Sequence, residues 1–134
     1  MQETGDKQRR SSGSLGGPDV VVLSDLHLGE GLREPPARYS VMEEFFCDRA
    51  FARLLEHLQQ RYAGHPEQLE LVLNGDVFDF LAVGRVPDEQ QAERRGFELA
   101  ATELRFGLNP SAAKSVYKLD VIAAGHPVFF SALA

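Results

Sequence analysis

Two short apolar runs, each ending abruptly in polar residues, organise the first half of the chain. DVVVLS occupies residues 19–24 and LELVLN occupies residues 69–74. The first run is rich in β-branched residues and almost wholly apolar, which is typical of a central parallel strand covered on both faces. Apolar residues between the runs recur at helical spacing up to about Tyr62. The pattern therefore predicts a right-handed βαβ unit and an α/β fold.

The helix inside this unit is expected to begin at Ser40. Glu43 follows three residues later, which matches a capping box. The apolar stripe of the predicted helix comprises Val41, Phe45, Phe51, Leu54, Leu55 and Leu58. Cys47 falls in line with this stripe, which predicts a buried, unreactive thiol. Residues 29–39 are expected to form a loop between the first strand and the helix.

The second half of the chain is predicted to be helical. A mostly polar helix is expected from about Asp88 to Phe106, weakened near Gly96 and closed by Gly107. A further helix is expected to start at residues 109–110, with Pro110 in the first turn, where its missing N–H costs nothing.

His126 stands in the last apolar segment, HPVFFSALA. The upstream residues Val116, Leu119 and Ile122 are spaced for a helix, so the favoured prediction places His126 at a break between two helices, with Pro127 opening the second. The alternative is a short strand over residues 119–123, which would make His126 a candidate metal ligand.

Composition limits the function classes. With 134 residues, 43% of them hydrophobic and 25% charged, the chain suits one small globular domain or part of a larger one. The 14 basic and 20 acidic residues give a net charge of -6, so there is no overall basic field to attract nucleic acid or anionic lipid. The only cysteine, Cys47, excludes an intramolecular disulfide and any zinc site that needs two thiolates.

The first 17 residues are polar and rich in glycine and serine. They predict a flexible tail ahead of a folded region over residues 18–134. No apolar run approaches the ~20 residues of a transmembrane helix, so we expect a soluble, cytoplasmic protein.

The candidate functional residues lie where the two predicted strands end. Asp25 and His27 follow the first strand, and Asp76 follows the second, after Gly75. Ligands of open α/β sheets bind beyond the carboxyl ends of the strands. Two residues apart in an extended segment, Asp25 and His27 are expected to project to the same side. The sequence thus predicts that Asp25, His27 and Asp76 share one crevice and bind metal.

This ligand set suggests phosphate-ester hydrolysis. A carboxylate has two oxygens, so Asp76 is the candidate bridge between two cations ~3.5–4 Å apart. Such a pair lowers the pKa of a shared water and neutralises charge that builds on a phosphoryl group. Manganese, iron, zinc and nickel suit mixed oxygen and nitrogen ligands, and magnesium suits them less.

The two motifs together resemble a known family. D-x-H at Asp25 and His27, followed about fifty residues later by G-D-x-x-D from Gly75 to Asp79, is similar to the first two motifs of the calcineurin-like metallophosphoesterases. The resemblance implies a β-sandwich flanked by helices, of which this chain would hold the βαβ unit and the helices after it. It also implies that Asp25 and His27 bind one metal, that Asp76 bridges two, and that Asp79 supports the site without binding metal.

The chain also departs from the family pattern. The later motifs G-N-H-[DE] and G-H-x-H are not present, and His126 has neither the asparagine before it nor the acid after it that the third motif requires. The resemblance is secure only over residues 19 to about 80. We therefore expect residues 18–134 to be the N-terminal portion of a phosphoesterase domain, inactive alone, that acts on a phosphomonoester, phosphodiester or pyrophosphate. The alternative is a non-catalytic metal-binding or vestigial module.

Structural roles are the alternative for several of these residues. Asp25 could cap a helix or a turn, and Asp76 could form an Asx-turn with Gly75. Arg33 and Arg38 could contact a substrate phosphate, although simple solvation is favoured. His57 and His65 are interpreted as structural. The expected aromatic core comprises Phe45, Phe46, Phe51, Phe129 and Phe130.

Overall fold

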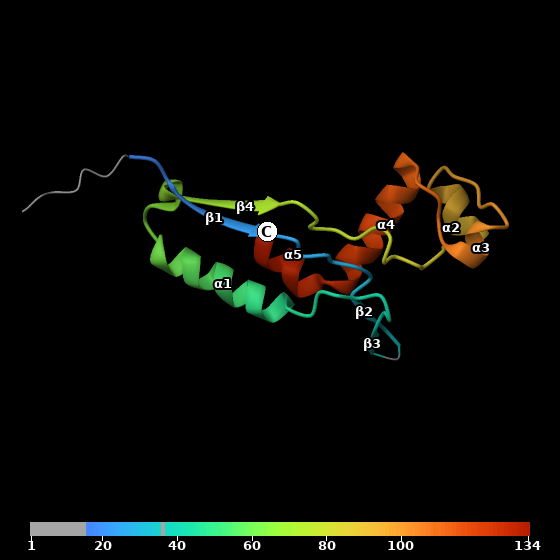
Figure 1. Ribbon diagram of the computed structural model, residues 1–134, viewed down its shortest axis with the longest axis horizontal. Coiled ribbons are helices and arrows are strands. Elements are labelled where there is room, and N and C mark those ends of the chain that lie inside the picture. The colour runs from blue at the N-terminus through green and yellow to red at the C-terminus, as the bar shows by residue number, and fades with distance from the viewer. Residues whose placement is uncertain (1–15, 36) are drawn as a thin grey trace, which may run out of the picture.

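The computed structural model describes residues 16–35 and 37–134, so all but the last two residues of the predicted tail lie outside the described part. The fold is mixed α/β (Figure 1). Strands β1 (Asp19–Ser24) and β4 (Leu69–Asn74) pair in parallel, in register from Asp19 and Leu69 to Ser24 and Asn74. Helix α1 (Asp48–Arg61) connects them. The predicted βαβ order and both strand boundaries are confirmed.

Strand β1 was predicted to be covered on both faces, but only one of its faces is covered among the described residues. Val20 and Val22 are 54% and 56% exposed, whereas Val21 and Leu23 pack against the core. Side chains alternate along a strand, and α1 lies along one face of the sheet (Figure 1). Within the described residues, the apolar run therefore belongs to a sheet with one open face.

The N-cap of helix α1 is Cys47, seven residues after the predicted N-cap Ser40, and the capping box does not form. The Glu43 side chain is buried and accepts hydrogen bonds from the backbone N–H groups of Gly29, Gly31 and Phe45. These bonds hold the segment before the helix in a non-helical path, so Val41 is fully exposed, against the prediction. The rest of the predicted apolar stripe is confirmed, since Phe45, Phe51, Leu54, Leu55 and Leu58 are buried or pack against the core. Cys47 is exposed at the N-cap of α1, which contradicts the buried thiol.

The predicted loop over residues 29–39 contains a small antiparallel hairpin. Its strands are β2 (Leu32–Arg33) and β3 (Arg38–Tyr39). A one-turn 3-10 helix, η1 (Pro66–Gln68), leads into β4.

The helix predicted from Asp88 to Phe106 is two short helices, α2 (Glu89–Arg94) and α3 (Glu103–Phe106). Asp88 caps α2 with a capping box. Gly96 breaks the helix with φ +76°, a left-handed conformation that glycine adopts without steric cost. The weak point was thus predicted correctly, but the segment does not continue as one helix.

Helices α4 (Ala112–Gly125) and α5 (Pro127–Leu133) complete the chain. Ser111 is the N-cap of α4, so Pro110 precedes the helix and does not occupy its first turn. His126 separates the two helices and Pro127 is the first residue of α5, which confirms the favoured prediction and excludes the alternative strand.

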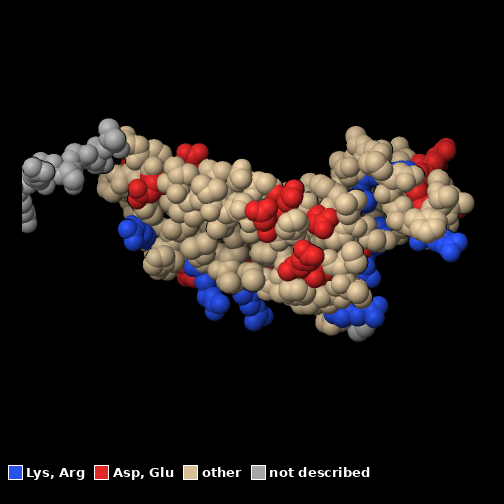
Figure 2. Space-filling model, in the orientation of Figure 1, with Lys and Arg blue, Asp and Glu red and all other residues tan. Residues whose placement is uncertain are grey.

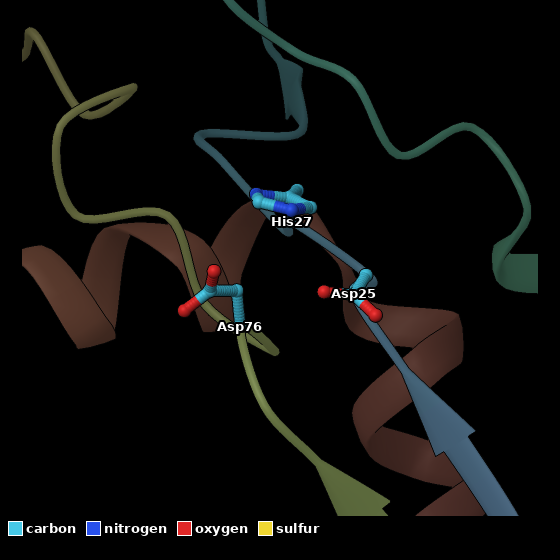
Figure 3. A group of neighbouring side chains, drawn as sticks. All are labelled: Asp25, His27 and Asp76. Carbon is cyan, nitrogen blue, oxygen red and sulfur yellow. The ribbon is translucent and has the colours of Figure 1, made fainter.

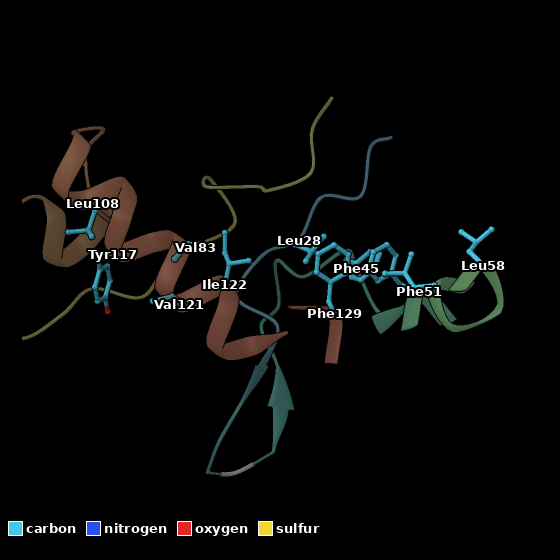
Figure 4. Close-up of a cluster of buried hydrophobic side chains, with 11 residues drawn as sticks. Leu28, Phe45, Phe51, Leu58, Val83, Leu108, Tyr117, Val121, Ile122 and Phe129 are labelled. Carbon is cyan, nitrogen blue, oxygen red and sulfur yellow. The ribbon is translucent and has the colours of Figure 1, made fainter. Parts of the chain in front are cut away.

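The core is an elongated series of apolar side chains from α1 to α4 (Figure 4). Phe51 stacks on Phe129 with ring centroids 4.1 Å apart, and Phe45 meets Phe129 edge-on. Phe46 is exposed, which contradicts its predicted place in the core, and Phe130 is partly buried. The buried cluster comprises Leu28, Phe45, Phe51, Leu55, Leu58, Val83, Leu108, Tyr117, Val121, Ile122 and Phe129. None of the helices among the described residues has the length and apolarity needed to cross a membrane.

Candidate metal centre

Asp25, His27 and Asp76 come together at the carboxyl ends of β1 and β4, as predicted. Each offers one oxygen or nitrogen atom, and these atoms lie within 4.8 Å of one another (Figure 3). Asp25 and Asp76 are exposed and His27 is half-buried. Two carboxylates and one imidazole are donors that divalent transition ions accept. The donor set therefore fits a metal.

The backbone reaches this arrangement differently from the prediction. The segment is not extended, because Asp25 and His27 have φ +54° and +53°. Left-handed backbone is uncommon in residues other than glycine, although aspartate and histidine adopt it more readily than most. Such conformations cost about 1–3 kcal/mol and cluster at functional sites. The surrounding contacts must therefore hold this turn in place.

Backbone hydrogen bonds supply part of that restraint. The His27 N–H donates to the Asp76 carbonyl oxygen at 2.9 Å, and the Leu28 N–H donates to that of Val77 at 2.9 Å. A tight turn places Asp76 itself, since the Val77 N–H donates to the Gly75 carbonyl at 2.7 Å and Gly75 has φ +73°. The two ligand-bearing loops are thus bonded to each other directly beyond the strands.

Asp79 is not part of this group of three donors. Its Oδ1 accepts hydrogen bonds from the backbone N–H groups of Leu81 at 2.8 Å and Ala82 at 3.1 Å. Lys118 on α4 fixes the same loop through a bond of 2.9 Å from Nζ to the Phe80 carbonyl oxygen. Burial lowers the pKa of Lys118, and the nearby Asp79 carboxylate opposes that shift. Asp79 thus supports the loop. Sequence reasoning missed Lys118, because lysines are usually exposed and its partner Phe80 lies 38 residues earlier in the chain.

Arg33 was expected to be simply solvated, and this prediction is wrong. It forms an ion pair with Glu30, whose side chain is fully buried. The other Glu30 oxygen accepts hydrogen bonds from the backbone N–H groups of Gly84 and Arg85. Arg33 therefore neutralises a buried carboxylate that ties the loop after His27 to the loop after Asp79. Arg38 is exposed in β3.

The remaining histidines do not join the cluster. His126 is fully buried and contacts Asp48 and Glu43. His57 is exposed on α1, and His65 lies 3.3 Å from Glu67 in the turn before β4.

Acidic side chains gather over the ends of β1 and β4, and basic ones lie along α1 and near the hairpin (Figure 2). This distribution attracts cations to the cluster and repels a phosphate until cations neutralise it. Comparison of the chain with protein-family models, curated proteins and solved structures gave no match.

Proposed function

We propose that Asp25, His27 and Asp76 bind divalent metal ions, and that the site serves hydrolysis of phosphate esters, as the resemblance to calcineurin-like metallophosphoesterases implies. The observation that carries the proposal is the convergence of three donor atoms within 4.8 Å, at the ends of two adjacent parallel strands. When bound, divalent ions there would polarise a phosphoryl oxygen and make water more acidic.

The chain's own residues would position the ions and keep the site open to substrate. The left-handed turn aims Asp25 and His27 at Asp76, and the backbone bonds across the two loops fix their separation. The exposure of Asp25 and Asp76 leaves room for a substrate phosphate. Asp76, with two carboxylate oxygens, is the proposed bridge between two ions.

A non-catalytic metal site is the second candidate. Each ion needs about four to six donors, and the described residues bring only three side chains together as a candidate group. Three donors are enough to bind one metal ion with modest affinity. Filling the coordination shells of two metal ions requires more donors than these three.

Calorimetric titration with Mn²⁺ tests the metal site. We expect binding by the chain, and at least ~10-fold weaker binding by Asp76→Asn and His27→Gln. The matched control is Asp79→Asn, whose remaining Oδ1 can still accept from Leu81 and Ala82. Equal binding by Asp76→Asn and the original chain would refute the site.

Titration with phenyl phosphate separates the two candidate functions. The phosphoesterase proposal expects Mn²⁺-dependent binding that Asp76→Asn removes, whereas metal binding without affinity for phosphate supports the non-catalytic site. We also expect little or no turnover of a chromogenic phosphodiester by the 134-residue chain. Turnover on the order of 1–10³ per second would contradict the view that these residues form only part of a centre.

A further inference from the structure

Glu43, Asp48 and His126 form a buried polar cluster that contacts the loop following His27. Glu43 precedes α1, Asp48 opens α1, and His126 separates α4 from α5. The side chains of Glu43 and His126 are fully buried, and that of Asp48 is 14% exposed. Phe45 packs edge-on against the imidazole, with ring centroids 5.8 Å apart. Buried polar groups in such surroundings are costly unless they are paired, so their contacts are strongly constrained.

The imidazole of His126 joins the two carboxylates. Its Nδ1 lies 3.1 Å from both oxygens of Asp48, and its Nε2 lies 3.4 Å from Oε2 of Glu43. The two carboxylates lie beside different nitrogens of the ring. A metal ion bound to one of these nitrogens could therefore not also be bound by both carboxylates. Among the described residues Nε2 has no hydrogen-bond partner, so its approach to Glu43 is a close polar contact and only the approach to Asp48 is a hydrogen bond. The imidazole, anchored by Asp48, thus lies against the Glu43 carboxylate and limits where that carboxylate can move.

Glu43 in turn holds the loop that carries the metal ligand His27. Its Oε1 accepts from the Gly29 N–H at 3.2 Å, and its Oε2 accepts from the Gly31 N–H at 2.5 Å. These amides follow His27 by two and four residues. A buried carboxylate that accepts backbone N–H groups makes strong, directional bonds.

Glycine packing fixes the same loop independently. Gly31 has φ +62°, and a Cβ added there would lie 2.8 Å from the Cα of Gly125. A Cβ added at Gly125 would lie 2.6 Å from the carbonyl carbon of Glu30. The loop therefore rests directly on the end of α4, next to His126, only because both residues lack side chains.

We propose that Glu43, His126 and Asp48 act together as positioning residues for His27, holding its left-handed backbone ready to bind metal. This inference rests on the proposed metal centre. The energetic reason is that a conformation costing about 1–3 kcal/mol persists only where neighbouring contacts enforce it. Side chains that orient metal ligands typically change metal affinity 10–100-fold when they are replaced.

Two variants break the connection, and a third serves as the control. Glu43→Gln weakens the acceptor for Gly29 and Gly31, and His126→Gln removes the imidazole anchored by Asp48. The control is Glu103→Gln, because Glu103 is also buried, at 1% exposure, and also accepts backbone N–H bonds, from Ala100 and Asn109. Glu103 lies in α3, outside the contacts of the His27 loop.

The readouts are Mn²⁺ affinity, the visible spectrum of the Co²⁺-loaded chain and amide hydrogen exchange. We expect Glu43→Gln and His126→Gln to lose 10- to 100-fold in Mn²⁺ affinity and to alter the Co²⁺ spectrum. Exchange should quicken at residues 27–31. Glu103→Gln should lower the melting temperature without changing these readouts. If Glu43→Gln does not fold, His126→Gln and the milder Asp48→Asn carry the test.

Three results would overturn the positioning role. These are unchanged exchange at residues 27–31 in Glu43→Gln and His126→Gln, unchanged affinity in variants that fold, or an equal loss of affinity in Glu103→Gln. Failure of the original chain to bind Mn²⁺ would instead refute the metal centre and the role that rests on it. The exchange measurement distinguishes these cases, because it reports on the loop without metal.

Discussion

The contact between Gly125 and the loop after His27 gives the sharpest structural prediction. In Gly125→Ala, the new Cβ would lie 2.6 Å from the Glu30 carbonyl carbon and 2.9 Å from the Gly31 Cα. Carbon atoms pack best at about 3.5–4.0 Å, so the loop must move by on the order of 1 Å. The obstacle is backbone on both sides, so no side chain can rotate to relieve it.

The expected loss of stability follows from two opposing terms. Overpacking typically costs about 1–3 kcal/mol, and we expect the upper end because the clash involves backbone. Alanine is favoured over glycine within a helix by at most about 1 kcal/mol. The net loss is therefore about 2 kcal/mol, which corresponds to a fall in melting temperature of roughly 6–10 °C for a domain of this size.

Thermal unfolding followed by circular dichroism measures this effect, with Gly84→Ala as the matched control. A Cβ at Gly84 would lie 3.7 Å from Oε1 of Glu30, which is ordinary van der Waals contact. We expect that control to be neutral or slightly stabilising. A melting temperature of Gly125→Ala within 2 °C of the original chain would refute the close packing of the loop against α4.

Three further outcomes are expected. Cys47 should react fully with a thiol reagent in the native chain, because it is exposed; protection until unfolding would contradict its position at the N-cap of α1. The hydrogen bond from Lys114 holds the pKa of Glu103 down at about 2, so its stabilising contribution should be present above pH 4.5 and lost as the pH falls toward 2. Melting temperatures of the original chain and Glu103→Gln should therefore converge as the pH falls from 6 to 3, and a constant difference would argue against this ion pair. Val22→Thr should change stability by less than about 0.5 kcal/mol, because Val22 is half-exposed and threonine is also β-branched; a loss above 1 kcal/mol would indicate that this face of β1 is covered.

Local patterns were sufficient to predict strands β1 and β4 and the convergence of the candidate ligands, but not the hairpin of β2 and β3. Strands β1 and β4 each show an apolar run that ends in polar residues, and parallel pairing then brings Asp25, His27 and Asp76 to one edge. The left-handed turn was not predictable, because aspartate and histidine adopt that conformation only when tertiary contacts impose it.

The main errors in the predicted secondary structure arise from contacts between residues that are far apart in the sequence. Ser40 and Glu43 have capping-box spacing, but the Glu43 carboxylate bonds to Gly29 and Gly31 instead, and α1 starts at Asp48. Cys47 is exposed because the helix begins only after it, although the apolar stripe from Phe51 to Leu58 faces the core as predicted. No local pattern indicates that a loop amide will reach a carboxylate twelve residues further along the chain.

We propose that metal binds to His27 and that His126 only positions the loop that follows it. Pulsed electron paramagnetic resonance of the Mn²⁺-loaded chain tests this directly, because a nitrogen-14 coupling reports a histidine bound to the ion. We expect coupling from one imidazole in the original chain, its loss in His27→Gln, and its retention in His126→Gln at Mn²⁺ concentrations that saturate the weaker site. Coupling that persists in His27→Gln, or disappears in saturated His126→Gln, would contradict the proposed centre.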